Sequence, residues 1–135
     1  MTLQLATDIQ NARLDVIEST TGTSPILVVF TGSQPANCAA ASTGSTLATM
    51  TLPVDWMALA AAGSKGLSGT WQDLVADASG TPGHFRIFES TGVTCKIQGS
   101  ASVNGGGGLM QFDTVPFVVG GVVAVTAFTL IDGNG

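Results

Sequence analysis

The stretch HFRIFESTGVTCKIQG, residues 84–99, decides the fold that the sequence predicts. Two segments of strand-like composition, His84–Glu89 and Val93–Gly99, flank the short polar sequence Ser90-Thr91-Gly92. Strand-like runs separated by a few residues that include glycine are typical of a β-hairpin. We therefore expect an antiparallel hairpin here.

The register of this hairpin follows from its apolar residues. A three-residue loop with Gly92 in the left-handed conformation pairs Phe85 with Ile97 and Ile87 with Cys95. This pairing keeps one face of both strands apolar, which is the condition that fixes register when one face is buried.

The same register predicts a polar outer face. It places Arg86 opposite Lys96, and His84 opposite Gln98, so His84 is expected to be a plain surface residue. Phe88 also falls on this outer face. An exposed aromatic there is a candidate contact with a partner, although isolated apolar side chains are common on surfaces.

Similar strand signals recur along the chain, with turn clusters between them. The segments are 26–30, 47–52, 69–76, 84–89, 93–99, 109–114, 116–119 and 122–132. This spacing predicts an all-β, single-domain antiparallel β-sandwich or jelly roll of about eight strands with one N-terminal α-helix. Residues 1–22 are expected to form the helical part and residues 23–135 the sandwich.

The helix is expected over Leu3–Glu18, with Thr2 as N-cap and Gly22 as the stop signal. One apolar stripe follows helical spacing and consists of Leu5, Ile9, Ala12 and Val16. Leu14 and Ile17 lie off this stripe. They either lie at the margins of a helix packed on the sheet or contact a neighbouring subunit.

The composition points to a protein whose surface is covered by other protein. Charged residues make up only 10% of the chain, against about 25% in typical soluble domains. A solvated monomer normally needs charge over its surface. We therefore expect a homo-oligomer, for example a trimer, or another protein partner.

The charge pattern argues against nucleic acid and membrane surfaces as partners. The net charge is −5, and the four basic residues are scattered. Binding to phosphates or to an anionic bilayer needs clustered cations. The uncharged stretch Val115–Ile131 is interrupted by Pro116 and by Gly120-Gly121, so we interpret it as two strands around a turn and not as a spanning helix.

Two further segments are interface candidates. The last strand is apolar on both faces, which predicts a central strand covered by protein on both sides, and this makes Val123 and Val125 candidate contacts. The consecutive glycines Gly105, Gly106, Gly107 and Gly108 predict a flexible surface loop, or a tip that becomes ordered on a partner.

The sequence offers no catalytic, metal or cofactor site. The only histidine is His84, the acids are spread singly, and Cys95 lies on the opposite hairpin face from His84 in the expected register. Catalysis and metal binding need such groups gathered together. We expect no enzyme activity. Trp56 and Trp71 are expected in the core; displayed at the surface, they would instead favour binding of host glycans.

Cys38 and Cys95 leave two alternatives open. The N-terminus lacks the pattern of a signal peptide, which favours a protein made in a reducing cytoplasm with two separate, half-buried thiols. The other possibility is a single disulfide formed late, after assembly or lysis.

Nearly the whole chain resembles a group of short virion proteins encoded in structural-gene clusters of tailed bacteriophages. The features that carry the resemblance are LATDIQNARLDVIESTTG (5–22), TGSQPANCAAAS (31–42), TLPVDWMALAAAGSKGLSGTW (51–71), GHFRIFES (83–90), CKIQGS (95–100) and VTAFTLIDGNG (125–135). The resemblance is one of overall pattern and carries over no functional residues.

This resemblance implies a structural protein of the virion, assembled in the host cytoplasm. The expected role is a capsid decoration or cement protein that binds itself and the major capsid protein, or another virion protein. A tail, neck or fibre-associated protein, or a host-glycan-binding module, are the alternatives. Copy number per particle separates a capsid or tail-tube location from the neck or fibre.

Overall fold

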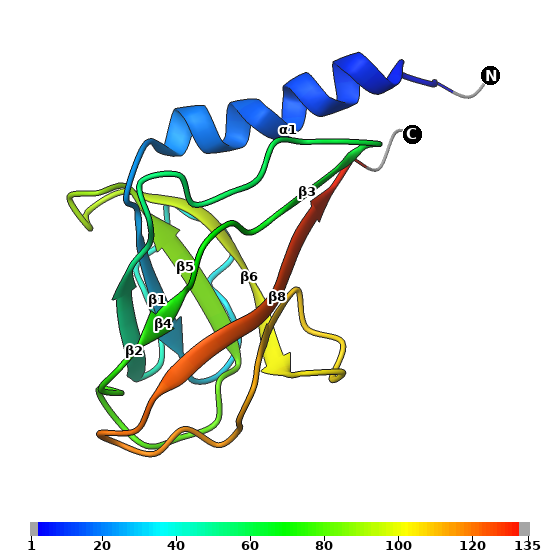
Figure 1. The fold of residues 1–135 in the computed structure, drawn as a ribbon. Coiled ribbons are helices and arrows are strands. Elements are labelled where there is room, and N and C mark those ends of the chain that lie inside the picture. The colour runs from blue at the N-terminus through cyan, green and yellow to red at the C-terminus, as the bar shows by residue number, and fades with distance from the viewer. Residues whose placement is uncertain (1–2, 133–135) are drawn as a thin grey trace.

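A computed structural model describes residues 3–132 and has one helix followed by a curved β-sheet (Figure 1). The elements are α1 (Thr7–Thr21), β1 (Ile26–Phe30), β2 (Thr46–Thr51), β3 (Ser64–Gly66), β4 (Gln72–Asp73), β5 (His84–Phe88), β6 (Cys95–Val103), β7 (Met110–Phe112) and β8 (Val123–Ile131). The predicted mostly-β single domain with an N-terminal helix is confirmed.

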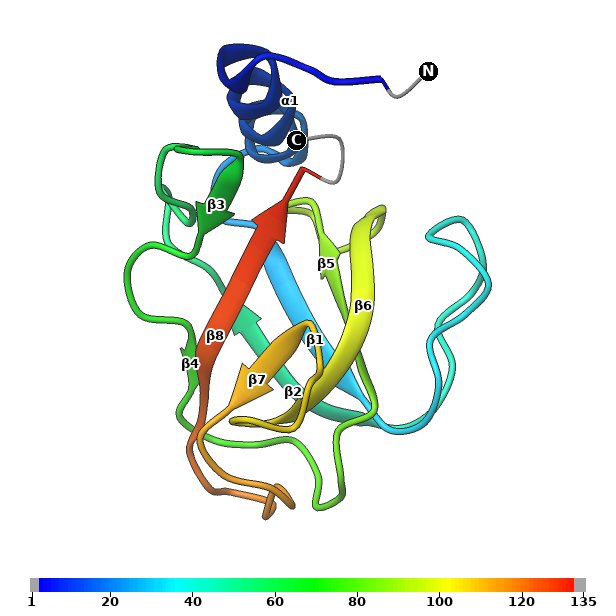
Figure 2. The same ribbon diagram turned by 90° about the vertical axis from the view of Figure 1, so that its right-hand side faces the viewer.

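The eight strands form one sheet in the order β2-β1-β5-β6-β7-β8-β3, and β4 pairs with β8. All pairings are antiparallel except that of β6 with β7. The sheet curls until β4 reaches β2, where the Thr49 N–H donates to Asp73 Oδ2 (3.1 Å). Figure 2 shows β7 and β8 in front of β1 and β2.

An aromatic core fills the inside of this curl. Trp71 contacts Trp56 and Phe128, with ring centroids 5.9 and 5.5 Å apart, and Phe128 meets Phe85 edge-on at 5.4 Å. All four side chains are buried. The prediction that both tryptophans lie in the core is confirmed.

Two predicted strands are largely wrong. In segment 69–76 only Gln72–Asp73 is a strand, and segment 116–119 contributes a single bridge, Phe117 to Gly80. Leu74, Val75, Val118 and Val119 lie in loops with exposed side chains, whereas Trp71, Ala76 and Phe117 are buried without forming a strand. Apolar content alone therefore overpredicted strands at this end of the molecule.

The hairpin exists, but its predicted register is wrong by two residues. Phe85 pairs with Gly99 and Ile87 with Ile97. A Cβ atom on Gly99 would lie 2.9 Å from the Phe85 ring, so only glycine leaves room for this aromatic residue. Gly92 does adopt a positive φ of 75°. A shift of two keeps the same faces together, which is why Phe85 and Ile87 still face the core.

The predicted outer face of the hairpin is buried, not solvated. Arg86 pairs with Gln98, and His84, Arg86 and Phe88 are at most 9% exposed. The loop of residues 31–45 makes hydrogen bonds to this face through Gly32, Cys38 and Ser42. The predictions of a surface His84 and of an exposed Phe88 contact are therefore wrong.

Helix α1 packs on its own domain with the face opposite to the one expected. Gln10, Leu14 and Thr21 are buried, whereas Ile9 and Val16 of the predicted stripe are about half exposed. Gly22 ends the helix as predicted, with φ 92°. The predicted cap, Thr2, lies outside the described residues, and no helix within residues 3–132 is long and apolar enough to span a membrane.

Strand β8 is central, as expected, since it lies between β7 on one side and β3 and β4 on the other. Val123 is buried in the core and Val125 packs against it. The interpretation of Val123 as a partner contact is therefore wrong, because the sheet itself covers this residue.

The glycine loop after β6 is at the surface, as predicted. Gly105, Gly106 and Gly107 are exposed, and Gly108 is half-buried. The Gly105 N–H donates to Gln111 Oε1 (3.0 Å) and the Gly108 N–H to Ser102 Oγ (2.9 Å). Side chains of β6 and β7 thus hold both ends of the loop without a partner.

Candidate functional site

One exposed apolar surface lies at the end of the molecule opposite α1. We call it the apolar tip, and it consists of Leu74, Val75, Val118, Val119 and Val122. Each of these side chains is 57–64% exposed. Figures 1 and 2 show that the two loops carrying them meet at this end. Large apolar side chains gathered in water typically mark a contact with another molecule.

Backbone hydrogen bonds fix the two loops of the apolar tip to each other. The Ala76 N–H donates to Gly121 O (2.8 Å), the Gly120 N–H donates to Ala76 O (3.0 Å), and Gly80 and Phe117 exchange two further bonds. Ala76 and Phe117 are buried beneath. The tip is therefore held in place before any partner binds, which lowers the entropy lost on association.

The charges around the apolar tip favour one class of binding partner over another. Segments 72–83 and 113–123 contain Asp73, Asp77 and Asp113 but no lysine or arginine. Anionic bilayers attract clustered cations and repel acids. An apolar surface with an acidic surround is better suited to a protein partner.

A second apolar surface lies at the other end, between α1 and the last residues of β8. It is a groove lined by Leu14, Val16, Ile17 and Ile131 together with Arg13. Val16 and Ile131 are exposed, Ile17 is half-buried and Leu14 forms the floor. Leu14 was predicted to be an interface residue, but its side chain is buried and offers almost no free surface. Ile17, the other predicted residue of the helix, does line the open groove.

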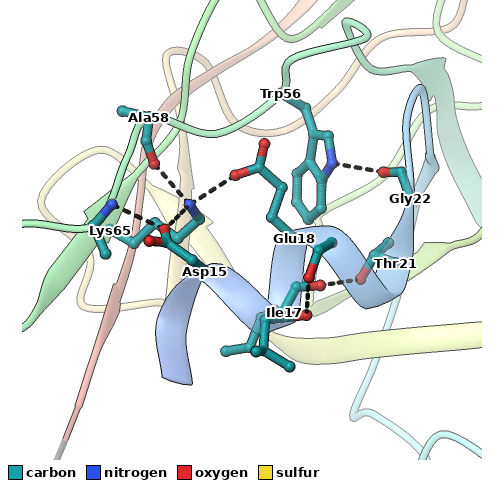
Figure 3. A network of polar contacts seen from close by, with 11 residues as sticks. Asp15, Ile17, Glu18, Thr21, Gly22, Trp56, Ala58 and Lys65 are labelled. Carbon is teal, nitrogen blue, oxygen red and sulfur yellow. Dashed lines mark hydrogen bonds and ion pairs between the residues drawn. The ribbon is translucent and has the colours of Figure 1, made fainter. Parts of the chain in front are cut away.

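A buried lysine attaches α1 to the rest of the domain (Figure 3). Lys65 Nζ lies 2.6 Å from Asp15 Oδ1, 2.7 Å from Glu18 Oε2 and 2.8 Å from Ala58 O. The Lys65 side chain is 1% exposed, and Asp15 also accepts a hydrogen bond from the Ala60 N–H. The helix is therefore attached through charge-assisted bonds.

These contacts shift the pKa values of both partners. The hydrogen bonds from Lys65 and from the Ala60 N–H hold the pKa of Asp15 below its ordinary value. Burial alone lowers the pKa of Lys65, but the hydrogen bonds to Asp15 and Glu18 outweigh it and raise the pKa overall. Both groups stay charged at neutral pH, so the network is a fixed structural element.

The lowered pKa of Asp15 makes the attachment of α1 sensitive to acid. A carboxylate with a depressed folded-state pKa contributes stability above its unfolded value, and this stability is lost as the pH falls through the folded value. We expect Asp15→Asn to have a lower free energy of unfolding than wild type at about pH 6, and the difference to vanish by about pH 2. Urea unfolding at both pH values measures it.

The control for this experiment is Asp55→Asn, which removes an exposed carboxylate outside the network. It should change stability little at either pH. A difference between wild type and Asp15→Asn that persists in acid would contradict the assignment.

A third constellation surrounds Arg86, whose side chain is buried under loop 31–45. Arg86 Nη2 donates to Cys38 O (2.7 Å) and Ala40 O (3.0 Å), and Nη1 donates to Ser42 Oγ (2.8 Å). Within residues 3–132 no carboxylate lies at salt-bridge distance from it. Carbonyl dipoles of the loop thus solvate the guanidinium.

The structure brings the two cysteines together beside Arg86. Cys38 Sγ and Cys95 Sγ are 3.0 Å apart, both as free thiols and both half-buried. Burial, together with the neighbouring Cys38 thiol, raises the pKa of Cys95 to about 11. The expected half-buried free thiols are present, but they are in contact and not apart, because loop 31–45 folds back onto the start of β6.

His84 takes a structural position. Its Nδ1 lies 2.9 Å from Gly32 O, and its ring stacks on Phe30 at 5.0 Å. Cys95 instead contacts Cys38 and interacts with Arg86. Within the described part of the chain, no group of three or more histidine, cysteine or acidic side chains is placed to hold a metal ion.

No protein-family model matches the sequence, and no curated protein or solved structure is significantly similar to it. The resemblance to tailed-phage virion proteins therefore stays a prediction.

Sequence reasoning missed three functional features of the fold. Residues 74–75 and 118–119 have the composition of strands, so the sequence does not distinguish the apolar tip from buried strands. Sequence reasoning also missed the burial of Lys65 and of Arg86. A signal for part of the tip was present, since Gly120-Gly121 marks a turn directly between Val119 and Val122.

Proposed function

We propose that the chain is a non-enzymatic structural protein of a tailed-phage virion, most readily a capsid decoration or cement protein. The observation that carries the proposal is the apolar tip, a rigid exposed surface of five aliphatic side chains. A chain with 10% charged residues has little other means of keeping such a surface in solution. Contact with another protein would remove the apolar tip from water.

The second groove beside α1 supports the same role. It lies at the opposite end of the domain from the apolar tip (Figure 1). A domain with apolar surfaces at two ends can contact two different neighbours at once, either two copies of itself or one copy and a shell protein. Simultaneous contacts convert weak single interactions into strong retention.

Neither tryptophan is available as a sugar-stacking platform, since Trp56 and Trp71 are buried. This removes the feature that would favour a host-glycan-binding module. A tail, neck or fibre-associated position remains the alternative within the virion. The number of copies per particle separates these positions.

The location is tested by quantifying the chain in purified particles of the phage that encodes it. We expect on the order of hundreds of copies on the outside of the head, as a symmetric shell requires. About a dozen copies or fewer at the neck or fibres would support the alternative. Absence from the particle would overturn the proposal.

The apolar tip itself is tested by a charged variant. Val118→Asp combined with Val119→Asp should fold normally, because both side chains are exposed, yet lose most of its binding to particles that lack the chain. Co-sedimentation with those particles measures it. We expect at least about a tenfold loss of affinity, since a buried unpaired carboxylate costs more than 1.4 kcal/mol.

The matched control is Val93→Asp, which changes a still more exposed valine in the hairpin loop away from the tip. It should sediment with particles as wild type does. Equal binding by all three proteins would show that the tip is not the contact surface.

A further inference from the structure

We infer that Cys38 and Cys95 are a built disulfide site, which closes loop 31–45 covalently onto strand β6 when the protein meets an oxidising environment. The two residues are 57 positions apart in the sequence, yet their Sγ atoms lie 3.0 Å apart. A disulfide bond is about 2.05 Å long. Bond formation therefore needs only a small movement of the two side chains.

The backbone on both sides of the site is fixed. Arg86 holds the Cys38 carbonyl at 2.7 Å, and Gln98 Nε2 donates to Pro35 O (2.8 Å) earlier in the same loop. Cys95 is the first residue of β6 and pairs with Phe88. Two unrelated segments are thus held so that their thiols face each other.

The thiols are also accessible to a small reagent. A surface pocket is lined by both cysteines together with Ala39, Ser42, Arg86 and Val93. Both cysteine residues are half-buried, so a peptide-sized disulfide can reach a sulfur atom without unfolding of the domain. Structural thiols that are sealed in a core lack this access.

The oxidant we propose is a low-molecular-weight disulfide such as oxidised glutathione. The Cys38 thiolate attacks one of its sulfur atoms, the reagent's S–S bond breaks, and one thiol is released. The Cys95 thiolate then attacks the Cys38 sulfur of the mixed disulfide and releases the second thiol. Two electrons pass to the reagent, and the two cysteine protons end on the two released thiols.

The order of attack follows from the surroundings of Cys95. Cys95 Sγ donates a hydrogen bond to Ile97 O (3.4 Å), which favours its protonated form. Burial also raises its pKa to about 11, so it supplies little of the nucleophilic thiolate at neutral pH. Cys38 is therefore the residue that attacks the reagent, and Cys95 is the resolving residue. The second step should accelerate as the pH rises.

The consequence is a redox-dependent gain in stability. A bond between residues 57 positions apart restricts the unfolded chain far more than the folded one, in which loop 31–45 is already in place. Formation of this bond does not depend on the proposed function, but the time at which it forms does. If the protein is made in a reducing cytoplasm and released in a particle, the bond forms after release.

The test uses the purified, reduced full chain incubated with oxidised glutathione. We expect the intact mass to fall by two hydrogen atoms, with a peptide linking Cys38 to Cys95 in the unreduced digest. The melting temperature should rise on the order of 10 °C and return on treatment with dithiothreitol. Cys38→Ser and Cys95→Ser should show no such rise.

The single variants also report the order of attack. Cys95→Ser should retain glutathione on Cys38, because the resolving thiol is missing, whereas Cys38→Ser should react slowly or not at all. Wild type that ends with glutathione on both cysteines, forms only intermolecular dimers, or keeps two free thiols would overturn the inference. None of these outcomes bears on binding by the apolar tip, so the two proposals fail separately.

Discussion

Arg86→Ala is expected to destabilise the protein by about 4 kcal/mol, because it removes the donor around which loop 31–45 is folded. The guanidinium satisfies Cys38 O, Ala40 O and Ser42 Oγ at 2.7–3.0 Å and is itself 1% exposed. Ser42 is exposed and can turn to water, but Cys38 and Ala40 are half-buried, and a carbonyl left without its donor there costs about 1–3 kcal/mol. Urea unfolding followed by tryptophan fluorescence measures the change in free energy of unfolding.

The comparison variant is Lys96→Ala, which removes an exposed cation from the adjacent strand β6. It should change stability by no more than about 0.5 kcal/mol. Arg86→Lys should recover only part of the loss, since a single ammonium group cannot reproduce the planar fork of donors. A loss below about 1 kcal/mol in Arg86→Ala would mean that the loop is held by other contacts.

The burial of Arg86 could not be predicted from the sequence. Strand alternation placed Arg86 and His84 on the face opposite Phe85 and Ile87, and the structure agrees. Alternation does not tell whether that second face meets water. Loop 31–45 covers it, and the contacts that attach a loop so far away in the sequence leave no local pattern.

The hairpin register illustrates a similar limit. Periodicity of two assigns each residue to a face, so any even shift satisfies it equally well. The structure selects the shift in which Phe85 lies over Gly99. Steric fit between one aromatic ring and one glycine decides the register, and no composition rule contains that information.

In helix α1, the spacing of apolar residues shows which side chains share a face of the helix. It does not show whether that face packs on the domain or faces solvent. The stripe containing Ile9 and Val16 was correctly grouped, yet it points outward. The inward face carries Asp15 and Glu18, because they bind the buried Lys65. A buried lysine that needs carboxylate partners thus places acidic residues on the inward face of the helix.

The sequence therefore predicts the class of fold but not the residues of the candidate site. The final strand was correctly placed between other strands of the sheet, whereas the expectation that other protein covers the weakly charged surface stays a prediction. The residues that form the apolar tip were not found, because Val118 and Val119 have the composition of a strand but lie in a loop. Hydrogen bonds to Ser79 and Gly121 hold that loop.

Phe128→Ala is expected to cost about 3–5 kcal/mol of stability, since it empties the middle of the aromatic core. Phe128 is the residue of β8 that contacts Phe85 on β5 (5.4 Å) and Trp71 beside β4 (5.5 Å), so its ring joins the two sides of the curled sheet. Loss of the ring removes both apolar burial and two aromatic contacts. Thermal and urea unfolding both measure the effect.

The neighbouring Thr129→Ala serves as the control for Phe128→Ala, because the Thr129 side chain points to solvent from the same strand. It should lie within about 0.5 kcal/mol of wild type. Phe128→Leu should fall between the two, since leucine fills part of the volume without the edge-on contact to Phe85. If Phe128→Ala were as stable as Thr129→Ala, the ring would not be the contact that closes the sheet, and the rigid scaffold on which the apolar tip depends would need another origin.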